Sequence, residues 1–73
     1  MRAMYIIVRR NDDNYQILYD RFQIDGSGEW RSPGEGTIDI PLQFKSSQKA
    51  TNEMLKAIEA EPWWDYTIEE YLR

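Results

Sequence analysis

The chain contains no cysteine and no histidine, and this absence restricts its fold more than any other feature of the sequence. Disulfide bridges and the usual zinc sites, which stabilise many domains of similar size, are excluded. A chain of 73 residues forms one domain, residues 1–73, which buries about 60 to 65% of the surface that its unfolded form exposes. We therefore expect one sheet and one helix, held together by side-chain packing alone.

The first half of the chain predicts strands that are separated by turn-forming residues. The first run is rich in β-branched and aromatic residues and is apolar on both faces, which indicates a central strand. Clusters of Asn, Asp, Gly and Ser follow each run and predict tight connections. The expected elements are a central strand at 3–10, its antiparallel return at 15–24 and a short strand at 29–31.

Residues 37–44 alternate between apolar and polar side chains, as a half-buried strand does. Pro41 lies within this run and has no N–H to donate to a neighbouring strand. The sequence therefore predicts a strand at the rim of the sheet. Its apolar face carries Ile38, Ile40, Leu42 and Phe44.

Residues 46–61 predict the helix. It begins after a serine N-cap at Ser46 or Ser47, and it ends near Glu61 because a residue before proline avoids the α conformation. Lys49 lies in the first turn, where a positive charge opposes the helix dipole, so we expect this end to fray. Apolar residues at helical spacing predict the packed face, namely Ala50, Met54, Ala57 and Ile58.

Residues 63–72 predict a final strand, and a helix from Tyr66 to Arg73 stays open as the alternative. The fold class is α+β, a small antiparallel or mixed sheet with one α-helix on one face, in the order β-β-(β)-β-α-β. A right-handed crossover places the last strand parallel to 37–44 and beside the first strand. One face of this last strand carries Trp64, Tyr66 and Ile68, and the other carries Trp63, Asp65, Thr67 and Glu69.

A single helix covers one face of a small sheet, yet the first two strands are apolar on both faces. We expect an apolar and aromatic patch of several hundred Å² on the face without the helix, a size typical of interaction surfaces. The Gly-Pro loop, a strong twist of the sheet, a second copy of the chain or a partner protein is expected to cover it. Tyrosine and tryptophan suit such a surface because each combines a large ring with a polar group.

The residue types that most enzymes use are missing or badly spaced. No serine has a histidine to activate it, and the glycines form neither a dinucleotide-binding nor a phosphate-binding loop. Asp12 and Asp13 occupy a turn that favours aspartate and lack the remainder of a calcium loop. The sequence predicts no catalytic residue, no cofactor and no metal, and hence no enzyme.

The charge of the chain is concentrated in its last third. The net charge is −4, and residues 46–73 carry three basic and six acidic side chains. This surface repels nucleic acid and favours a basic protein. The longest apolar run, residues 4–8, is too short to span a membrane, so we expect a cytoplasmic protein without a membrane partner.

We therefore predict a protein-binding module that docks on a basic, nucleic-acid-handling bacterial protein or complex. Small phage-encoded inhibitors of bacterial defence, anti-CRISPR proteins among them, share this size and composition, which is an analogy without a motif. The alternatives are a nucleic-acid-binding regulator that uses an arginine and tyrosine face, and a subunit of a homodimer or larger homo-oligomer. The predicted partner-binding residues are Trp30, Arg31, Tyr15, Tyr19, Trp63, Asp65, Glu69 and Glu70.

Trp30 lies within the flexible stretch GSGEWRSPGEG, residues 26–36, and has two explanations. In the first, its ring covers the face of the protein's own sheet that the helix cannot reach, and its removal lowers thermal stability. In the second, its ring is an anchor for a partner, and its removal lowers affinity while stability stays nearly unchanged.

Overall fold

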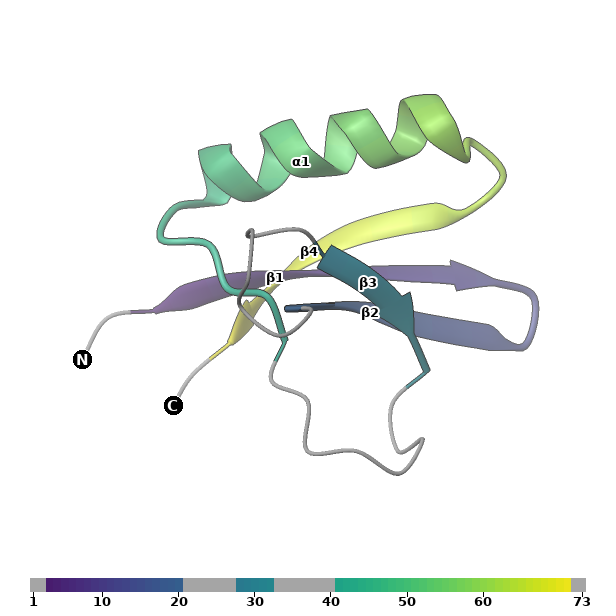
Figure 1. Ribbon diagram of the computed structural model, residues 1–73, viewed down its shortest axis with the longest axis horizontal. Helices are drawn as coiled ribbons and strands as arrows, with labels where there is room; N and C mark the ends of the chain where they lie inside the picture. The colour runs from purple at the N-terminus through teal and green to yellow at the C-terminus, as the bar shows by residue number, and fades with distance from the viewer. Residues whose placement is uncertain (1–2, 21–27, 33–40, 72–73) are drawn as a thin grey trace.

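A computed structural model shows one antiparallel sheet with a single helix across one of its faces (Figure 1). The structure describes residues 3–20, 28–32 and 41–71. The strands are β1 (Met4–Asn11), β2 (Asn14–Asp20), β3 (Gly28–Arg31) and β4 (Asp65–Tyr71), and the helix is α1 (Ser47–Ala60). The spatial order of the strands is β3-β2-β1-β4, which confirms the α+β fold class.

β1 lies between β2 and β4 and buries side chains on both of its faces, as its composition predicts. Ile6, Ile7 and Val8 are 6%, 0% and 0% exposed. A two-residue turn joins β1 to β2, and Asp12 in this turn has a φ of 53°. Aspartate tolerates this left-handed conformation, which tight hairpin turns require.

The predicted strand at 37–44 is only partly described, since residues 37–40 lie outside the described residues. The described part, residues 41–44, is not a regular strand, and the predicted position at the rim is wrong: the segment fills the space where β1 and β2 diverge and bonds to both strands. Phe44 exchanges two backbone hydrogen bonds with Tyr5 of β1, and Leu42 N–H donates to the carbonyl of Leu18 on β2. Pro41, without an N–H, forms an isolated bridge with Tyr19. The sequence also predicts that the second strand continues through residues 21–24, and these lie outside the described residues.

α1 begins and ends where the sequence predicts. Ser46 is the N-cap, and its side-chain oxygen accepts a hydrogen bond from the Lys49 N–H at 3.2 Å. Glu61 is the C-cap, and its N–H donates to the Ala57 carbonyl at 2.8 Å. The first turn of the helix contains no acidic residue, so the helix dipole is not complemented there.

The last segment is a strand and not a helix, which resolves the open alternative. β4 pairs with β1 in antiparallel register from Met4↔Tyr71 to Arg10↔Asp65. The bridge between Tyr5 and Phe44 is antiparallel as well, so β4 and the segment before the helix run in the same direction on the two sides of β1. This confirms the predicted position beside the first strand.

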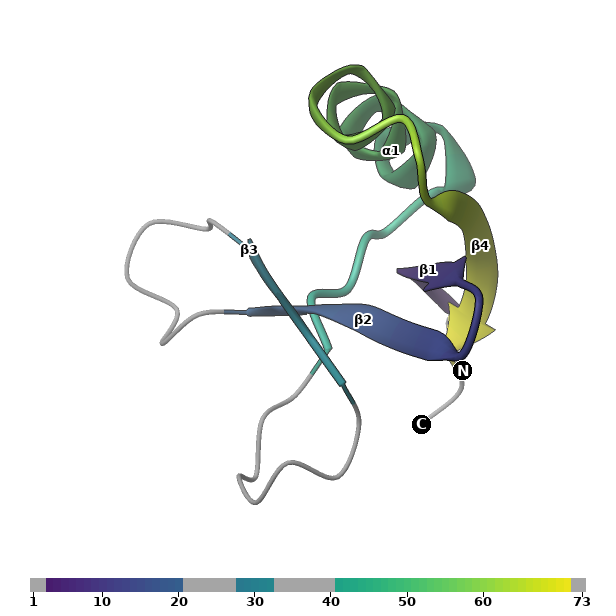
Figure 2. The ribbon, with the colours of Figure 1, turned by 90° about the vertical axis from the view of Figure 1, so that its right-hand side faces the viewer.

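The core lies between α1 and one face of the sheet. α1 contacts β1 and β4, while β2 and β3 extend beyond the helix to one side (Figure 2). Three residues of the core are buried, namely Ile7, Leu18 and Ala50. Half-buried apolar side chains surround them, namely Tyr5, Trp30, Leu42, Phe44, Met54, Tyr66 and Ile68.

The face of the sheet opposite α1, here called the open face, does not carry the predicted bare apolar patch in its described part. Among the described residues, the exposed large apolar side chains are Leu55 on α1 and Trp63 before β4. On the open face, Val8 is fully buried, and the register places Ile17 and Thr67 on either side of it. Val8 is therefore covered within the folded chain itself, without a second copy or a partner.

The helix N-terminus supplies a stability test. We expect Lys49→Glu to raise the free energy of unfolding by about 0.5 to 1 kcal/mol, because a glutamate there completes a capping box with Ser46 and complements the dipole. Urea unfolding measures this change. The control is Lys56→Glu, which alters the net charge by the same amount as Lys49→Glu. It removes the 3.2 Å ion pair with Glu53 and should not raise the free energy of unfolding. Equal stabilisation by both variants would contradict the dipole explanation.

Candidate functional site

The most elaborate cluster of polar and aromatic side chains in the structure surrounds Arg9 of β1. Arg9 is only 5% exposed. Its guanidinium carbon lies 4.3 Å from the ring centroid of Trp30 and 4.1 Å from that of Trp64. The cation is therefore enclosed between two indole rings, an arrangement that a delocalised guanidinium group tolerates well.

Hydrogen bonds satisfy the charged edge of Arg9. Its Nε and Nη2 donate to Oε1 of Gln16 at 2.8 and 2.6 Å, and its Nη1 donates to Oε2 of Glu61 at 2.8 Å. The ion pair with Glu61 joins β1 to the end of α1, although 52 residues separate the partners. By contrast, the buried indole nitrogen of Trp64 has no hydrogen-bond partner among the described residues. The Trp64 ring packs against the guanidinium group of Arg9.

This geometry weighs against the predicted arginine and tyrosine surface for nucleic acid. Arg9 is buried and paired, and Tyr5 packs in the core, so neither side chain is available to phosphates or bases. Arg10 is exposed but lies on the open face, with its guanidinium carbon 5.1 Å from the centroid of Tyr15. Arg21 lies outside the described residues. Arg31 lies on the open face as well, together with Tyr15 and Tyr19, so the described residues place two of the predicted arginines on that face and not the complete set.

Trp30 covers part of its own protein. Its ring lies against Arg9 and meets Tyr66 edge-to-face, with 5.7 Å between centroids and 67° between planes. The register pairs Trp30 with Leu18, so its side chain joins the core on the helix side of the sheet. The structure thus supports the first explanation of this residue, with one difference. Trp30 covers the part of the helix-side face over β2 and β3, and not the open face.

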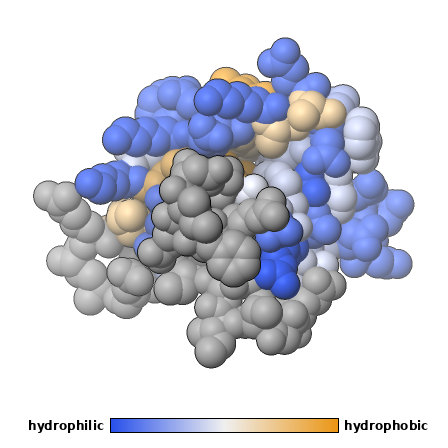
Figure 3. Space-filling model, in the orientation of Figure 1, coloured by the Kyte–Doolittle hydropathy of each residue, from blue (hydrophilic) through white to orange (hydrophobic). Residues whose placement is uncertain are grey.

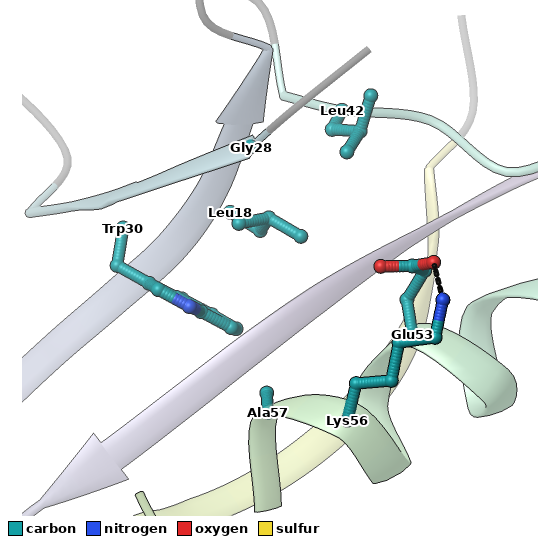
Figure 4. Close-up of a pocket in the computed structure, with 7 residues that line it drawn as sticks. All are labelled: Leu18, Gly28, Trp30, Leu42, Glu53, Lys56 and Ala57. Atoms are coloured by element: carbon teal, nitrogen blue, oxygen red, sulfur yellow. Dashed lines mark hydrogen bonds and ion pairs between the residues drawn. The ribbon is translucent and has the colours of Figure 1, made fainter. Parts of the chain in front are cut away.

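A groove separates part of β2 and β3 from α1 because the backbone of the helix lies over β1 and β4. Its volume is about 330 Å³. Leu18, Trp30 and Leu42 form one wall, while Ala57 and the Glu53–Lys56 ion pair of α1 form the other (Figure 4). Gly28 also lines the groove, and a Cβ atom there would lie 2.5 Å from Leu18 Cδ1. Glycine at this position therefore allows the close approach of β3 and Leu18.

The other predicted partner-binding residues fall into two groups. Tyr15, Tyr19 and Arg31 lie half-buried on β2 and β3, on the open face. A second group, which we call the acidic edge, is exposed along β4 and the turn before it. The acidic edge consists of Trp63, Asp65, Glu69 and Glu70.

The register connects the acidic edge to one member of the first group. Arg10 of β1 pairs with Tyr15 on one side and with Asp65 on the other. Side chains that are directly opposite in neighbouring strands lie within contact distance, so this row crosses the open face near the β1–β2 turn. Tyr19 and Arg31 lie towards the other side of the sheet. The predicted residues therefore do not form a single site.

The acidic edge combines an exposed aromatic ring with negative charge. Trp63 is 62% exposed, the highest value among the large apolar side chains of the described residues. The stretch from Glu59 to Glu70, both included, contains five acidic residues and no basic residue. Hydrophilic side chains also dominate the surface over α1 and the β1–β2 hairpin, with small apolar areas between them (Figure 3). The acidic edge is thus the most exposed of the predicted groups.

Comparison with known proteins finds no family model, no curated protein sequence and no solved structure that matches this chain. No helix in the described part of the chain is long and apolar enough to cross a membrane. Within the same residues, no three acidic side chains converge as metal ligands would. The function is therefore argued from the geometry of the exposed surface.

Arg9 gives a direct test of the cluster around it. We expect Arg9→Ala to lower the free energy of unfolding by about 2 to 4 kcal/mol, because two stacked rings and the partners Gln16 and Glu61 lose their contact. Arg10→Ala, on the neighbouring exposed residue, should change it by less than about 0.5 kcal/mol. Thermal unfolding followed by circular dichroism compares the two. Equal losses would show that Arg9 is not a central contact.

The tryptophans provide a second matched pair. We expect Trp30→Ala to lower the free energy of unfolding by about 2 to 3 kcal/mol, since the half-buried ring packs on Arg9 and Tyr66. Trp63→Ala should change it by less than about 0.5 kcal/mol because that ring is exposed. Urea unfolding measures both. If Trp30→Ala leaves the free energy of unfolding unchanged, the second explanation, in which Trp30 is an anchor for a partner, is favoured.

Proposed function

We propose that this protein is a non-catalytic binding module whose acidic edge docks on a basic surface of another protein. The observation that carries this proposal is the exposure of Trp63 next to exposed carboxylates of β4. Tryptophan contributes strongly to protein interfaces because it buries a large area at low entropic cost. An isolated domain gains nothing from holding such a ring in water.

The charges define the class of partner. Asp65, Glu69 and Glu70 are exposed on one strand, and the ion pairs found among the described residues do not involve them. Their field attracts a basic surface, accelerates encounter and disfavours acidic partners. Basic surfaces of this kind are typical of proteins that bind nucleic acid.

Such docking would block the nucleic-acid site of the partner. Asp65 and Glu69 on one side of the edge strand and Glu70 on the other would occupy positions of phosphates in a basic groove, while Trp63 supplies apolar contact area. The biological role that this supports best is a small phage or mobile-element inhibitor of a bacterial nucleic-acid-handling complex, acting in the cytoplasm. The analogy with anti-CRISPR proteins in size and composition agrees with this role.

The test uses the tagged, folded protein in a bacterial lysate that has been treated with nuclease. We expect it to retain a basic protein, and Glu69→Lys to abolish this retention. Glu29→Lys is the matched control, because this substitution changes the net charge equally. Glu29 is an exposed glutamate on β3, a different strand of the sheet. This control should retain the partner as well as the parent protein does.

Two results would contradict the proposal. One is that the folded parent protein retains no protein above background. The other is that Glu69→Lys and Glu29→Lys weaken retention to the same extent, which would indicate a response to net charge alone. If the protein instead retains nucleic acid from a lysate without nuclease, and this retention falls steeply with salt concentration, the regulator alternative is favoured.

A further inference from the structure

β4 is an edge strand with an unpaired side. It is the last strand in the order β3-β2-β1-β4, and no described residue pairs with its outer side. Figure 2 shows it at the margin of the sheet, away from β2 and β3. β4 is paired with β1 over its whole length of seven residues, so its backbone is regular and extended.

The hydrogen bonds of β1 identify which backbone groups of β4 are free. Tyr5 N–H donates to Phe44 O at 2.9 Å, and Phe44 N–H donates to Tyr5 O at 2.8 Å. Both groups of Tyr5 therefore point away from β4. Since successive residues of a strand direct these groups to opposite sides, Ile6 and Val8 direct theirs towards β4.

The register then assigns the residues of β4. Glu69 and Thr67 lie opposite Ile6 and Val8, so they use their N–H and C=O groups to pair with β1. The intervening residues, Tyr66, Ile68 and Glu70, direct theirs to the free side. Those groups form a regular row that another strand can pair with.

Natural edge strands are usually protected against such pairing by proline, a bulge, short length or charge. β4 contains no proline and no glycine, and its pairing with β1 is continuous. Its protection against pairing consists of the side chains of Asp65, Glu69 and Glu70, which all carry a negative charge. Protection by one sign of charge repels an acidic strand and attracts a basic one.

We propose that β4 binds an extended, basic segment of a partner protein by antiparallel strand addition. This inference rests on the proposed function and names the way in which the acidic edge recognises its partner. The added strand pairs with the backbone of Tyr66, Ile68 and Glu70. Its basic side chains lie opposite Asp65, Glu69 and Glu70, at the close cross-strand distance that favours opposite charges.

A second copy of this chain is a poorer occupant for the same edge. Antiparallel pairing of two β4 strands centred on Ile68 places Thr67 opposite Glu69, and it brings the Glu69 side chains of both copies into diagonal positions. Each chain also carries a net charge of −4. Like charges on neighbouring strands are unfavourable, so the edge selects a strand of opposite charge.

The register predicts the sequence pattern of the partner segment. Read antiparallel to β4, it has basic residues opposite Glu70 and Glu69, an apolar residue opposite Ile68, and a small polar residue opposite Thr67. The pattern ends with an apolar residue opposite Tyr66 and a basic residue opposite Asp65. The capped synthetic peptide Lys-Arg-Val-Thr-Val-Arg has this pattern and serves as the probe.

Amide hydrogen exchange of the full-length protein, measured by NMR with and without this peptide, tests the proposal. We expect saturable binding that slows exchange at the N–H groups of Ile68 and Glu70 by at least tenfold. The N–H groups of Thr67 and Glu69 already pair with β1 and should change much less. Protection at every second residue is a signature that nonspecific charge attraction does not produce.

The matched control peptide carries N-methyl groups on both valines, the residues opposite Ile68 and Tyr66. It has the same charge but cannot donate the backbone hydrogen bonds that the added strand requires. We expect at least tenfold weaker binding of this peptide. The Glu69→Lys protein should also bind the unmodified peptide at least tenfold more weakly, whereas the Glu29→Lys protein should bind it like the parent.

Three outcomes would overturn strand addition. These are equal binding of the two peptides, protection without alternation along β4, and no binding of the unmodified peptide. If the tagged protein nevertheless loses its lysate partner through Glu69→Lys, the acidic edge still docks on a basic protein and only the mode of binding is wrong. A concentration-dependent dimer that protects the same N–H groups without peptide would show that a second copy is the occupant.

Discussion

The enclosed guanidinium group of Arg9 is the interaction on which the remaining structure depends. It contacts Trp30 of β3 and Trp64 of the turn before β4, and it is hydrogen-bonded to Gln16 of β2 and Glu61 at the end of α1. One side chain of β1 thereby contacts β2, β3, the end of α1 and the turn that leads into β4. A chain of this length without disulfides or a histidine-bound metal has few other means to hold its layers together.

The position of α1 follows from these contacts. The Arg9–Glu61 ion pair and the hydrogen bond from the Tyr66 hydroxyl to the Glu61 carbonyl fix the end of the helix over β1 and β4. β2 and β3 extend past the helix, so Trp30 covers that part of the face and a groove remains beside it. β4 is the last strand in the order of the sheet and has its outer side free of pairing with any described residue.

In the binding mode proposed above, the acidic edge has two roles. Carboxylates along an edge strand disfavour pairing between copies of this chain, because each copy brings the same charge. The same carboxylates would make the free backbone groups of Tyr66, Ile68 and Glu70 selective for a basic segment. The proposed inhibitor function uses this selectivity, and the exposed ring of Trp63 adds an apolar contact at the start of the strand.

Periodicity and turn chemistry in the sequence determined the α+β class, the central position of β1, the limits of α1 and the exposure of the acidic side chains of β4. These are local properties, because alternation and helix capping depend on neighbouring residues. Only the tertiary structure decided that Trp30 covers its own sheet, that Arg9 is buried, and that the described part of the open face has no bare apolar patch. The sole sequence signal for Arg9 was its alternation with Tyr5 and Ile7, which places it on the core side of β1. Its partners Gln16, Trp30 and Glu61 are distant in sequence, and only the folded sheet brings them to one point.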